Sequence, residues 1–230
     1  MKKIFLLLLC FFFCSCVPVK KVAEDFTSTQ IVCVWLDATG SFRVCKDRML
    51  QDFSNGVRNL LLKKNPFQKH HLFIGIIGEE PMSLLATELS QNTWQEILQI
   101  LKFVKDLELP IECATDIYGT YEYTEAYLRR YCRANKISAE KLKCALIYYS
   151  DMGHRAKRNQ PGLETFSYLP FCRVSIIFAP GELHPDIQAR ELQEQEEFLS
   201  KLGLHFSAVF PPSTLLSQEE SLLEKCLKKL

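Results

Sequence analysis

The sequence predicts a doubly wound α/β fold, in which helices cover both faces of a mostly parallel sheet with one antiparallel edge strand. Three observations lead to this expectation. Short apolar runs alternate along the chain with amphipathic segments of helical period. The runs are apolar at nearly every position, which is typical of strands buried on both faces. The chain shows neither an internal repeat nor a second domain boundary.

The first predicted unit is a strand, a helix and a second strand. Residues 30–36 form a near-continuous apolar run, which indicates a buried strand. Residues 43–62 carry apolar side chains at helical spacing, and Asn65-Pro66 ends that helix. Residues 71–78 form the second buried strand.

The middle of the chain predicts an edge strand and two helices. After a turn at 79–81, residues 82–89 return as a short antiparallel edge strand. Thr93 is expected to cap the next helix, because Thr is favoured at that position and apolar residues at helical spacing follow it. A further helix is expected over 116–134, and most of its tyrosines are expected to be packing residues.

The last third continues the same alternation. Its apolar runs predict strands at 144–150, 173–179 and 204–210. An exposed helix rich in Glu and Gln is expected over 184–202, and an amphipathic helix over 215–230 closes the fold.

Composition narrows the class of function. The chain has 230 residues, with 28 Lys plus Arg against 27 Asp plus Glu, so its formal net charge is +1. That balance gives no electrostatic basis for nucleic-acid binding, which needs a clustered basic excess. Hydrophobic residues make up 47% and charged residues 24%, which excludes a mostly disordered chain.

The N-terminus has the pattern of a targeting segment. Lys2 and Lys3 precede an apolar run over 4–14, which is too short to span a membrane as a helix, and small Ser15 then precedes Cys16. This pattern resembles a bacterial lipoprotein signal peptide. The resemblance implies a signal peptide over 1–15, an acylated Cys16 with a tether over 16–29, and a globular domain over 30–230. An ordinary secretory signal and an N-terminal membrane anchor are the alternatives. The expected location is the bacterial cell envelope, with the chain lipid-anchored and facing the periplasm or the exterior.

Oxygen-bearing side chains follow the predicted strands at one edge of the sheet. The first strand is followed by Asp37, Thr39 and Ser41, the third helix is preceded by Thr115, and the strand at 144–150 is followed by Asp151. The carboxyl ends of parallel strands are where ligands bind in such sheets. Two carboxylates with hydroxyls suit a hard divalent cation, with Mg2+ as the first choice and Mn2+ or Ca2+ as alternatives.

These five residues resemble the metal-ion-dependent adhesion site of von Willebrand factor type A domains, and the resemblance covers about residues 30–212. That family carries Asp-x-Ser-x-Ser after its first strand, a Thr before its third helix and an Asp after its fourth strand. The chain departs from the family where Gly is common, because it has Cys113-Ala114 before Thr115 and Met152 after Asp151. The resemblance implies adhesion or assembly, with the cation bridging to an acidic group on a protein partner.

Four further residues are expected on the same rim, where they would contact such a partner: Asp116, Tyr118, His154 and Arg155. The basic ones would steer an acidic partner towards the cation, unless they belong to a merely solvated loop.

Two other interpretations remain open. In one, Asp37 and Thr39 only cap backbone N–H groups, which would leave a scaffold of the same fold without a metal. A Mg2+-dependent phosphatase that resembles the haloacid dehalogenases would use Asp37 as its nucleophile. That family has a second Asp where this chain has Thr39, and it needs a Lys that only Lys141 or Lys143 could supply. Binding without turnover is therefore the expected function.

The ten cysteines divide into two groups. Cys10, Cys14 and Cys16 belong to the N-terminal segment, and seven remain in the domain. A bridge between Cys33 and Cys144 is conceivable because their strands are neighbours in the family. Buried free thiols are the stronger expectation, since Cys packs as a small hydrophobe.

Overall fold

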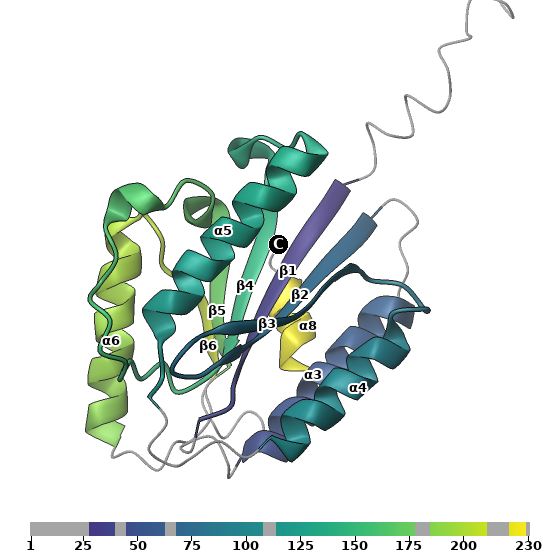
Figure 1. Cartoon of the computed structure of the whole chain (residues 1–230), viewed down its shortest axis with the longest axis horizontal. Coiled ribbons are helices and arrows are strands. Elements are labelled where there is room, and N and C mark those ends of the chain that lie inside the picture. The colour runs from purple at the N-terminus through teal and green to yellow at the C-terminus, as the bar shows by residue number, and fades with distance from the viewer. Residues whose placement is uncertain are drawn as a thin grey trace, which may run out of the picture.

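The computed structural model describes residues 28–39, 45–62, 68–107, 114–177, 185–210 and 221–228. Six strands form a single sheet in the order β3-β2-β1-β4-β5-β6, with β3 at one edge (Figure 1). All neighbouring strands are parallel except β2 and β3. The strands are β1 (Ser28–Asp37), β2 (Gln68–Ile77), β3 (Met82–Glu88), β4 (Lys143–Tyr149), β5 (Cys172–Ile177) and β6 (Phe206–Phe210).

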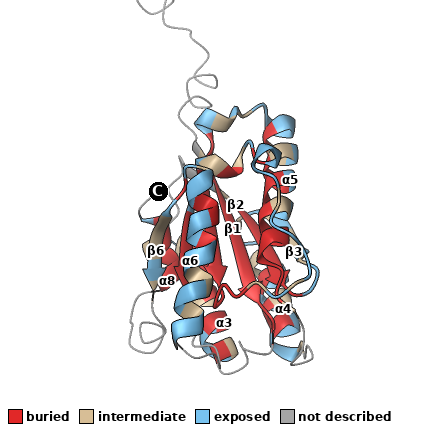
Figure 2. Cartoon of the chain, turned by 90° about the vertical axis from the view of Figure 1, so that its left-hand side faces the viewer, coloured by how far each residue is buried: buried red, intermediate tan, exposed pale blue. Residues whose placement is uncertain are grey.

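Helices cover both faces of this sheet, which confirms the predicted doubly wound α/β fold. One face carries α3 (Lys46–Leu62), α4 (Trp94–Asp106) and α8 (Leu222–Leu227), whose apolar side chains form one core cluster with the sheet. The other face carries α5 (Ile117–Asn135) and α6 (Pro185–Lys201), which form a second cluster. Figure 2 shows the buried strands between the two helical layers.

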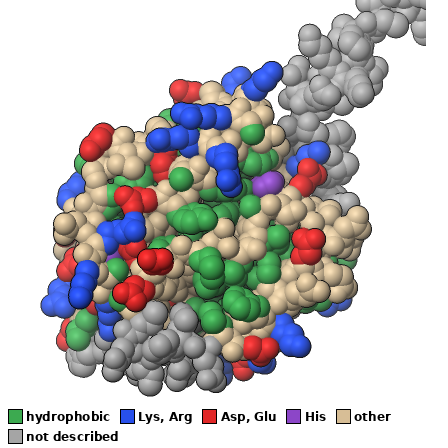
Figure 3. Space-filling view, in the orientation of Figure 1, with side chains coloured by type: hydrophobic (Ala, Val, Ile, Leu, Met, Phe, Trp, Pro, Cys, Tyr) green, Lys and Arg blue, Asp and Glu red, His purple; other side chains and the backbone are tan. Residues whose placement is uncertain are grey.

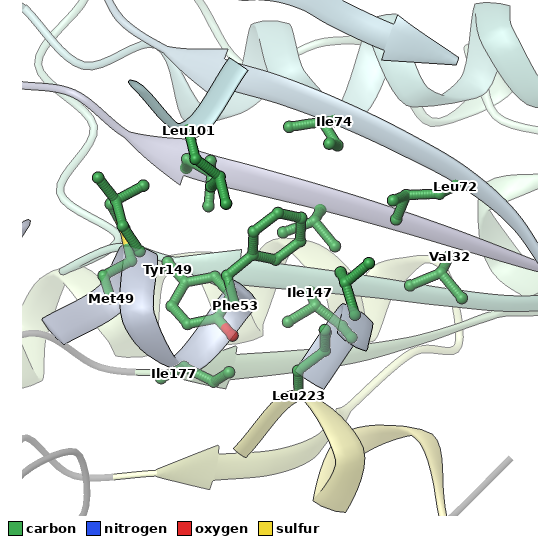
Figure 4. Packing of buried hydrophobic residues seen from close by; sticks show 14 of the residues in the cluster. Val32, Met49, Phe53, Leu72, Ile74, Leu101, Ile147, Tyr149, Ile177 and Leu223 are labelled. Carbon is green, nitrogen blue, oxygen red and sulfur yellow. The ribbon is translucent and has the colours of Figure 1, made fainter. Parts of the chain in front are cut away.

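The two clusters follow from the alternation of side chains along each strand. In β1, Val32 and Val34 face the α3 side, whereas Cys33 and Trp35 face the α5 side. Because both faces are buried, the strand is apolar at every position from Ile31 to Leu36. Figure 4 shows how side chains from the sheet, α3 and α8 interlock in the first cluster. On the α5 side the Trp35 ring lies directly against Gly75, where an added Cβ would overlap the indole.

A buried carboxylate ties α5 to the segment that leads into β5. Glu125 accepts hydrogen bonds from the backbone N–H groups of Tyr168 and Leu169 and from the hydroxyl of Ser167, and it pairs with Arg129. Burial alone would raise the pKa of Glu125, but these hydrogen bonds outweigh burial and lower it. The ionised carboxylate therefore stabilises the folded chain.

Several element boundaries differ from the predictions by one to three residues. The first strand begins at Ser28, because Ser28 and Thr29 already pair with β2. Thr93 does precede α4, but its hydroxyl makes no capping bond and instead donates to the Ser90 carbonyl, so the predicted side-chain cap is wrong. Of the last predicted helix, the structure describes α8 alone.

The six cysteines within the described residues are all buried, and none of the six forms a disulfide: Cys33, Cys45, Cys132, Cys144, Cys172 and Cys226. The expectation of buried thiols is confirmed for these six, and Cys113 lies outside the described residues. The predicted signal peptide, Cys16 and most of the tether lie outside them as well. Within the described part of the chain, no helix is long and apolar enough to cross a membrane.

Candidate functional site

Asp37 ends β1 with its side chain buried and held by neutral donors. Its Oδ1 accepts hydrogen bonds from the Thr39 backbone N–H at 2.9 Å and the Thr39 hydroxyl at 2.6 Å. Its Oδ2 accepts a bond from the hydroxyl of Ser150, at the end of β4, at 2.7 Å. Because β1 and β4 are parallel neighbours, their ends meet at one edge of the sheet. The carboxylate is therefore fixed by both strands.

Thr115 reaches the same edge from the start of α5. Its hydroxyl lies 3.4 Å from that of Thr39. The backbone of this segment is anchored on both sides, since Asp116 N–H donates to the Gly78 carbonyl and Arg155 N–H to the Thr115 carbonyl. These bonds hold the start of α5 between the ends of β2 and β4.

Asp151 follows β4 in a tight loop. Its Oδ1 accepts the Gly153 backbone N–H at 3.0 Å, and the Ser150 hydroxyl accepts the Met152 N–H at 2.9 Å. Met152 has a φ of 61°, in the left-handed region that favours Gly. Its buried side chain packs in the cluster on the α5 side. The loop thus turns sharply and keeps the Asp151 carboxylate near that of Asp37.

The charge of this site is unbalanced. Burial raises the pKa of Asp37 to about 6, the charge of Asp151 adds to the rise, and the hydrogen bonds from Thr39 and Ser150 oppose it. Within the described ranges, neither Asp37 nor Asp151 forms an ion pair with a basic side chain. Two buried carboxylates side by side are stabilised by a bound cation.

Four of the five predicted ligands therefore lie together, and Ser41 lies outside the described residues. All four donor groups are oxygens, which fits a hard cation. In the part of the chain that the structure describes, no three His, Cys, Asp or Glu side chains form a metal-binding group. A cation here would depend on the hydroxyls of Thr39 and Thr115, and on water, to complete its shell.

The predicted rim residues mostly contact one another. Asp116 is buried, caps α5 by accepting the Gly119 N–H, and lies 3.0 Å from Arg158 Nε and 3.8 Å from His154 Nδ1. The Tyr118 ring packs on His154 at a centroid distance of 4.4 Å and is only 9% exposed.

Arg155 lies 3.7 Å from Glu191 of α6. The basic side chains near the site thus have acidic neighbours within the chain.

Two residues near the site were not predicted. Ser150 holds Asp37, and its position directly before Asp151 was the available signal. Glu191 lies beside the loop after β4, where its carboxylate would overlap a Cβ added at Gly153. Burial raises the pKa of Glu191, Arg155 opposes the rise and Asp151 adds to it. In the sequence, Glu191 is one of many acidic residues on a helix that is predicted to be exposed, so no sequence signal distinguishes it.

The chain's sequence matches no protein-family model and no curated protein. Solved structures do match its fold. The proximal thread matrix protein 1 of the mussel byssus aligns with a TM-score of 0.51 and 12% identity over 87% of this chain and 48% of that protein. A second structure of that protein, with a zinc-occupied metal-ion-dependent adhesion site, aligns with the same TM-score of 0.51 at 13% identity.

A bacterial structure matches over nearly its whole length. BatB from Bacteroides thetaiotaomicron aligns with a TM-score of 0.50 and 12% identity over 87% of this chain and 98% of that one. The chain spans about half the length of the mussel protein, so the likeness concerns the domain alone. Together with the sheet order and the antiparallel edge strand, these matches show that the chain has the fold of von Willebrand factor type A domains.

Proposed function

We propose that the domain binds a divalent cation at Asp37, Thr39, Thr115 and Asp151, and that the cation binds an acidic group on a protein partner. Ser41 is expected to complete the ligand set. The two carboxylates would offset the charge of the ion, and the hydroxyls would shape its shell. Mg2+ is the first candidate, with Mn2+ and Ca2+ as alternatives. The function is adhesion or assembly rather than turnover.

The observation that carries this proposal is the pair of buried carboxylates. Capping alone explains why Asp37 accepts bonds from Thr39, but it does not explain a second acid at the same place. Burial raises the pKa of Asp37 and the charge of Asp151 adds to the rise, so the ionised Asp37 opposes folding at neutral pH unless a cation is present. The zinc-occupied site of the mussel protein shows that a domain of similar fold holds a metal ion.

The phosphatase alternative finds less support in the geometry. It needs a lysine beside the acids, and the candidates offered by the sequence were Lys141 and Lys143. Lys143 begins β4, whereas Asp151 follows the other end of that strand. The strand separates the lysine from the two acids by its full length.

Metal binding is tested directly with Mn2+, whose free ion gives a paramagnetic resonance signal that binding suppresses. The full chain is expected to bind Mn2+, and Mg2+ is expected to compete. Asp151→Asn should abolish the binding, whereas Asp47→Asn, which changes a 77% exposed carboxylate on α3, should leave it intact. Equal binding by all three proteins, or none by the wild type at millimolar metal, would leave only the scaffold interpretation.

Partner binding is tested by a pull-down from envelope extracts with and without EDTA. A protein that is retained by the wild type in Mg2+, and lost both in EDTA and with Asp151→Asn, fits the proposal. Hydrolysis of p-nitrophenyl phosphate that disappears in Asp37→Asn would instead favour the phosphatase.

We further propose that the chain is tethered to a bacterial membrane through an acylated Cys16. Each methylene of an acyl chain that is buried in a bilayer contributes about 0.8 kcal/mol of binding free energy, so lipidation would hold the domain at the membrane surface. The test is incorporation of labelled palmitate by the wild type and its loss in Cys16→Ser, with Cys14→Ser as the control. Label retained by Cys16→Ser, or a soluble secreted product, would contradict the tether.

A further inference from the structure

The β3 edge of the sheet is open. β3 pairs with β2 on one side and, among the strands that the structure describes, has no neighbour on the other. Its side chains are partly or fully exposed from Met82 to Glu88, with Ala86 among the exposed ones. In Figure 1 this strand runs across the front of the molecule, between α5 and α4. An open edge of this kind is a template for another strand.

The hydrogen-bond pattern identifies which backbone groups are available. Leu89 N–H donates to the His70 carbonyl, and the antiparallel register continues from there to Ile74 and Leu85. Hydrogen-bonded pairs alternate along an antiparallel ladder, so Leu85 and Thr87 face β2. The N–H and C=O of Ala86, which lies between them, therefore point outward from the sheet.

A row of tyrosines on α5 borders this edge. Tyr123, Tyr127 and Tyr131 are four residues apart and so lie on one face of the helix. The Tyr123 hydroxyl donates to Ser83 Oγ of β3 at 3.0 Å, which places the start of the row beside the start of the strand. The Tyr131 ring lies 4.4 Å from that of His71, whose strand partner is Glu88, so the row ends beside the end of the strand.

A pocket opens on the outer flank of this row. It has a volume of about 320 Å³ and is lined by Tyr123, Ala126, Tyr127 and Arg130. Small Ala126 leaves the hollow between the two aromatic rings and the guanidinium. The size suits a single apolar side chain with room for a polar end.

The pocket has a positive end. Within the described residues, no carboxylate lies at ion-pair distance from Arg130, whereas its neighbour Arg129 pairs with Glu125. Figure 3, which views the β3 side, shows hydrophobic side chains gathered across the middle of the face and Lys and Arg side chains above them, over α5. An apolar surface next to an uncompensated arginine is complementary to an acidic, amphipathic segment.

We propose that the β3 edge and the α5 pocket bind an extended segment of a partner protein, which adds a strand beside β3. The segment's backbone pairs with Ala86, one apolar side chain enters the pocket between Tyr123 and Tyr127, and a nearby Asp or Glu pairs with Arg130. This surface uses neither Asp37 nor Asp151, so it is independent of the cation site.

A second copy of the chain fits the surface less well. In a two-fold pairing of β3 edges, both α5 helices would lie on the same face of the joined sheet. Each helix would then bring the exposed Arg130 to the shared face, where like charges repel. A heterologous acidic segment matches that charge instead.

The test is a selection of random seven-residue peptides displayed on phage, with the immobilised full chain as bait. Enriched peptides are expected to alternate β-branched or aromatic residues with polar ones and to contain an Asp or Glu. The enriched peptides are then synthesised and their affinity for each protein is measured. Arg130→Glu should lower this affinity by about tenfold or more. Arg133→Glu, which makes the same change of charge on the same helix outside the pocket, is the matched control.

Ala86→Pro tests the backbone pairing. Proline removes the outward N–H but is tolerated on an edge strand. The substitution should therefore lower the affinity for the peptides about tenfold without changing the midpoint of thermal unfolding. Should that variant unfold, slower exchange of the Ala86 amide in the wild type with bound peptide gives the same information.

Three results would overturn the proposal. They are a selection without enriched peptides, peptides that bind Arg130→Glu as well as the wild type, and binding that EDTA abolishes, which would move the peptides to the cation site. If the chain dimerises and Ala86→Pro suppresses the dimer, the β3 edge binds a second copy of the chain instead of a partner segment.

Discussion

Asp37→Asn separates the electrostatic contribution of the candidate site from its hydrogen bonds. The amide keeps an oxygen that accepts the Thr39 N–H and hydroxyl, and its NH2 group can donate to Ser150 Oγ, which also accepts bonds. The substitution therefore removes one buried negative charge with little change in shape. We expect it to stabilise the metal-free chain and to abolish stabilisation by Mg2+.

The magnitude follows from the pKa of Asp37, which burial and Asp151 raise from 3.8 to about 6 in the folded chain. Because the folded-state pKa lies above the unfolded one, the stability due to this group is complete below the unfolded pKa and is lost as the pH rises through the folded pKa. Above that pH the loss amounts to about 3 kcal/mol. In EDTA at neutral pH, Asp37→Asn should therefore be more stable than the wild type by up to that amount.

Magnesium should remove most of this difference. A ligand at a hundred times its Kd stabilises the folded state by about 2.7 kcal/mol, and only the wild type would gain it. Urea unfolding followed by Trp fluorescence, at several pH values between 4 and 8 with EDTA or Mg2+, measures both effects. Asp47→Asn on the surface controls for net charge. Wild-type and Asp37→Asn curves that depend on pH equally in EDTA would refute the charge argument, and equal stabilisation by Mg2+ would refute the site.

Three other substitutions test the surrounding structure. Gly75→Ala should lower the free energy of unfolding by about 1–3 kcal/mol in urea, because its Cβ would overlap the Trp35 ring, and a neutral result would mean that the ring moves freely. Glu125→Gln should lower the free energy of unfolding by about 1–3 kcal/mol at neutral pH, and by less in acid, where the wild-type carboxyl is protonated at the lowered pKa of Glu125. Amide exchange at Leu169 should become faster, because its N–H loses a charged acceptor. An equal loss of stability at all pH values would contradict this. Met152→Gly should unfold at higher urea than Met152→Ala, the reverse of the usual order, because only Gly relieves the left-handed backbone.

The fold was predictable because its strands are buried on both faces. In such strands every residue is apolar, so the runs at 31–36 and 144–149 are visible in the sequence without any knowledge of register. The edge strand was predictable from its turn and its mixed polarity. The cap at Thr93 was not, because Ser90 competes for the same hydroxyl in a turn whose geometry the sequence does not specify.

The candidate site was predictable where its residues follow strand ends, and obscure where it depends on packing across elements. Asp37 and Asp151 follow β1 and β4 directly, so their proximity is a consequence of strand order. Glu191 reaches the loop only through the way α6 packs on the sheet. Arg130 and the tyrosines of α5 likewise become a surface only beside β3, whose position relative to that helix no local pattern reveals.

The arrangement around Asp37 argues against capping as its sole purpose. A cap requires one acceptor at the end of β1, and the bonds from Thr39 already satisfy that need. The fold nevertheless adds Ser150 to the second oxygen and holds Asp151 nearby through a loop with a left-handed Met152. Neutral donors only partly offset the burial of charge, as the raised pKa of Asp37 shows. The left-handed Met152 and the two neighbouring acids therefore both support the proposed cation site, because an ion between the carboxylates would offset their charge.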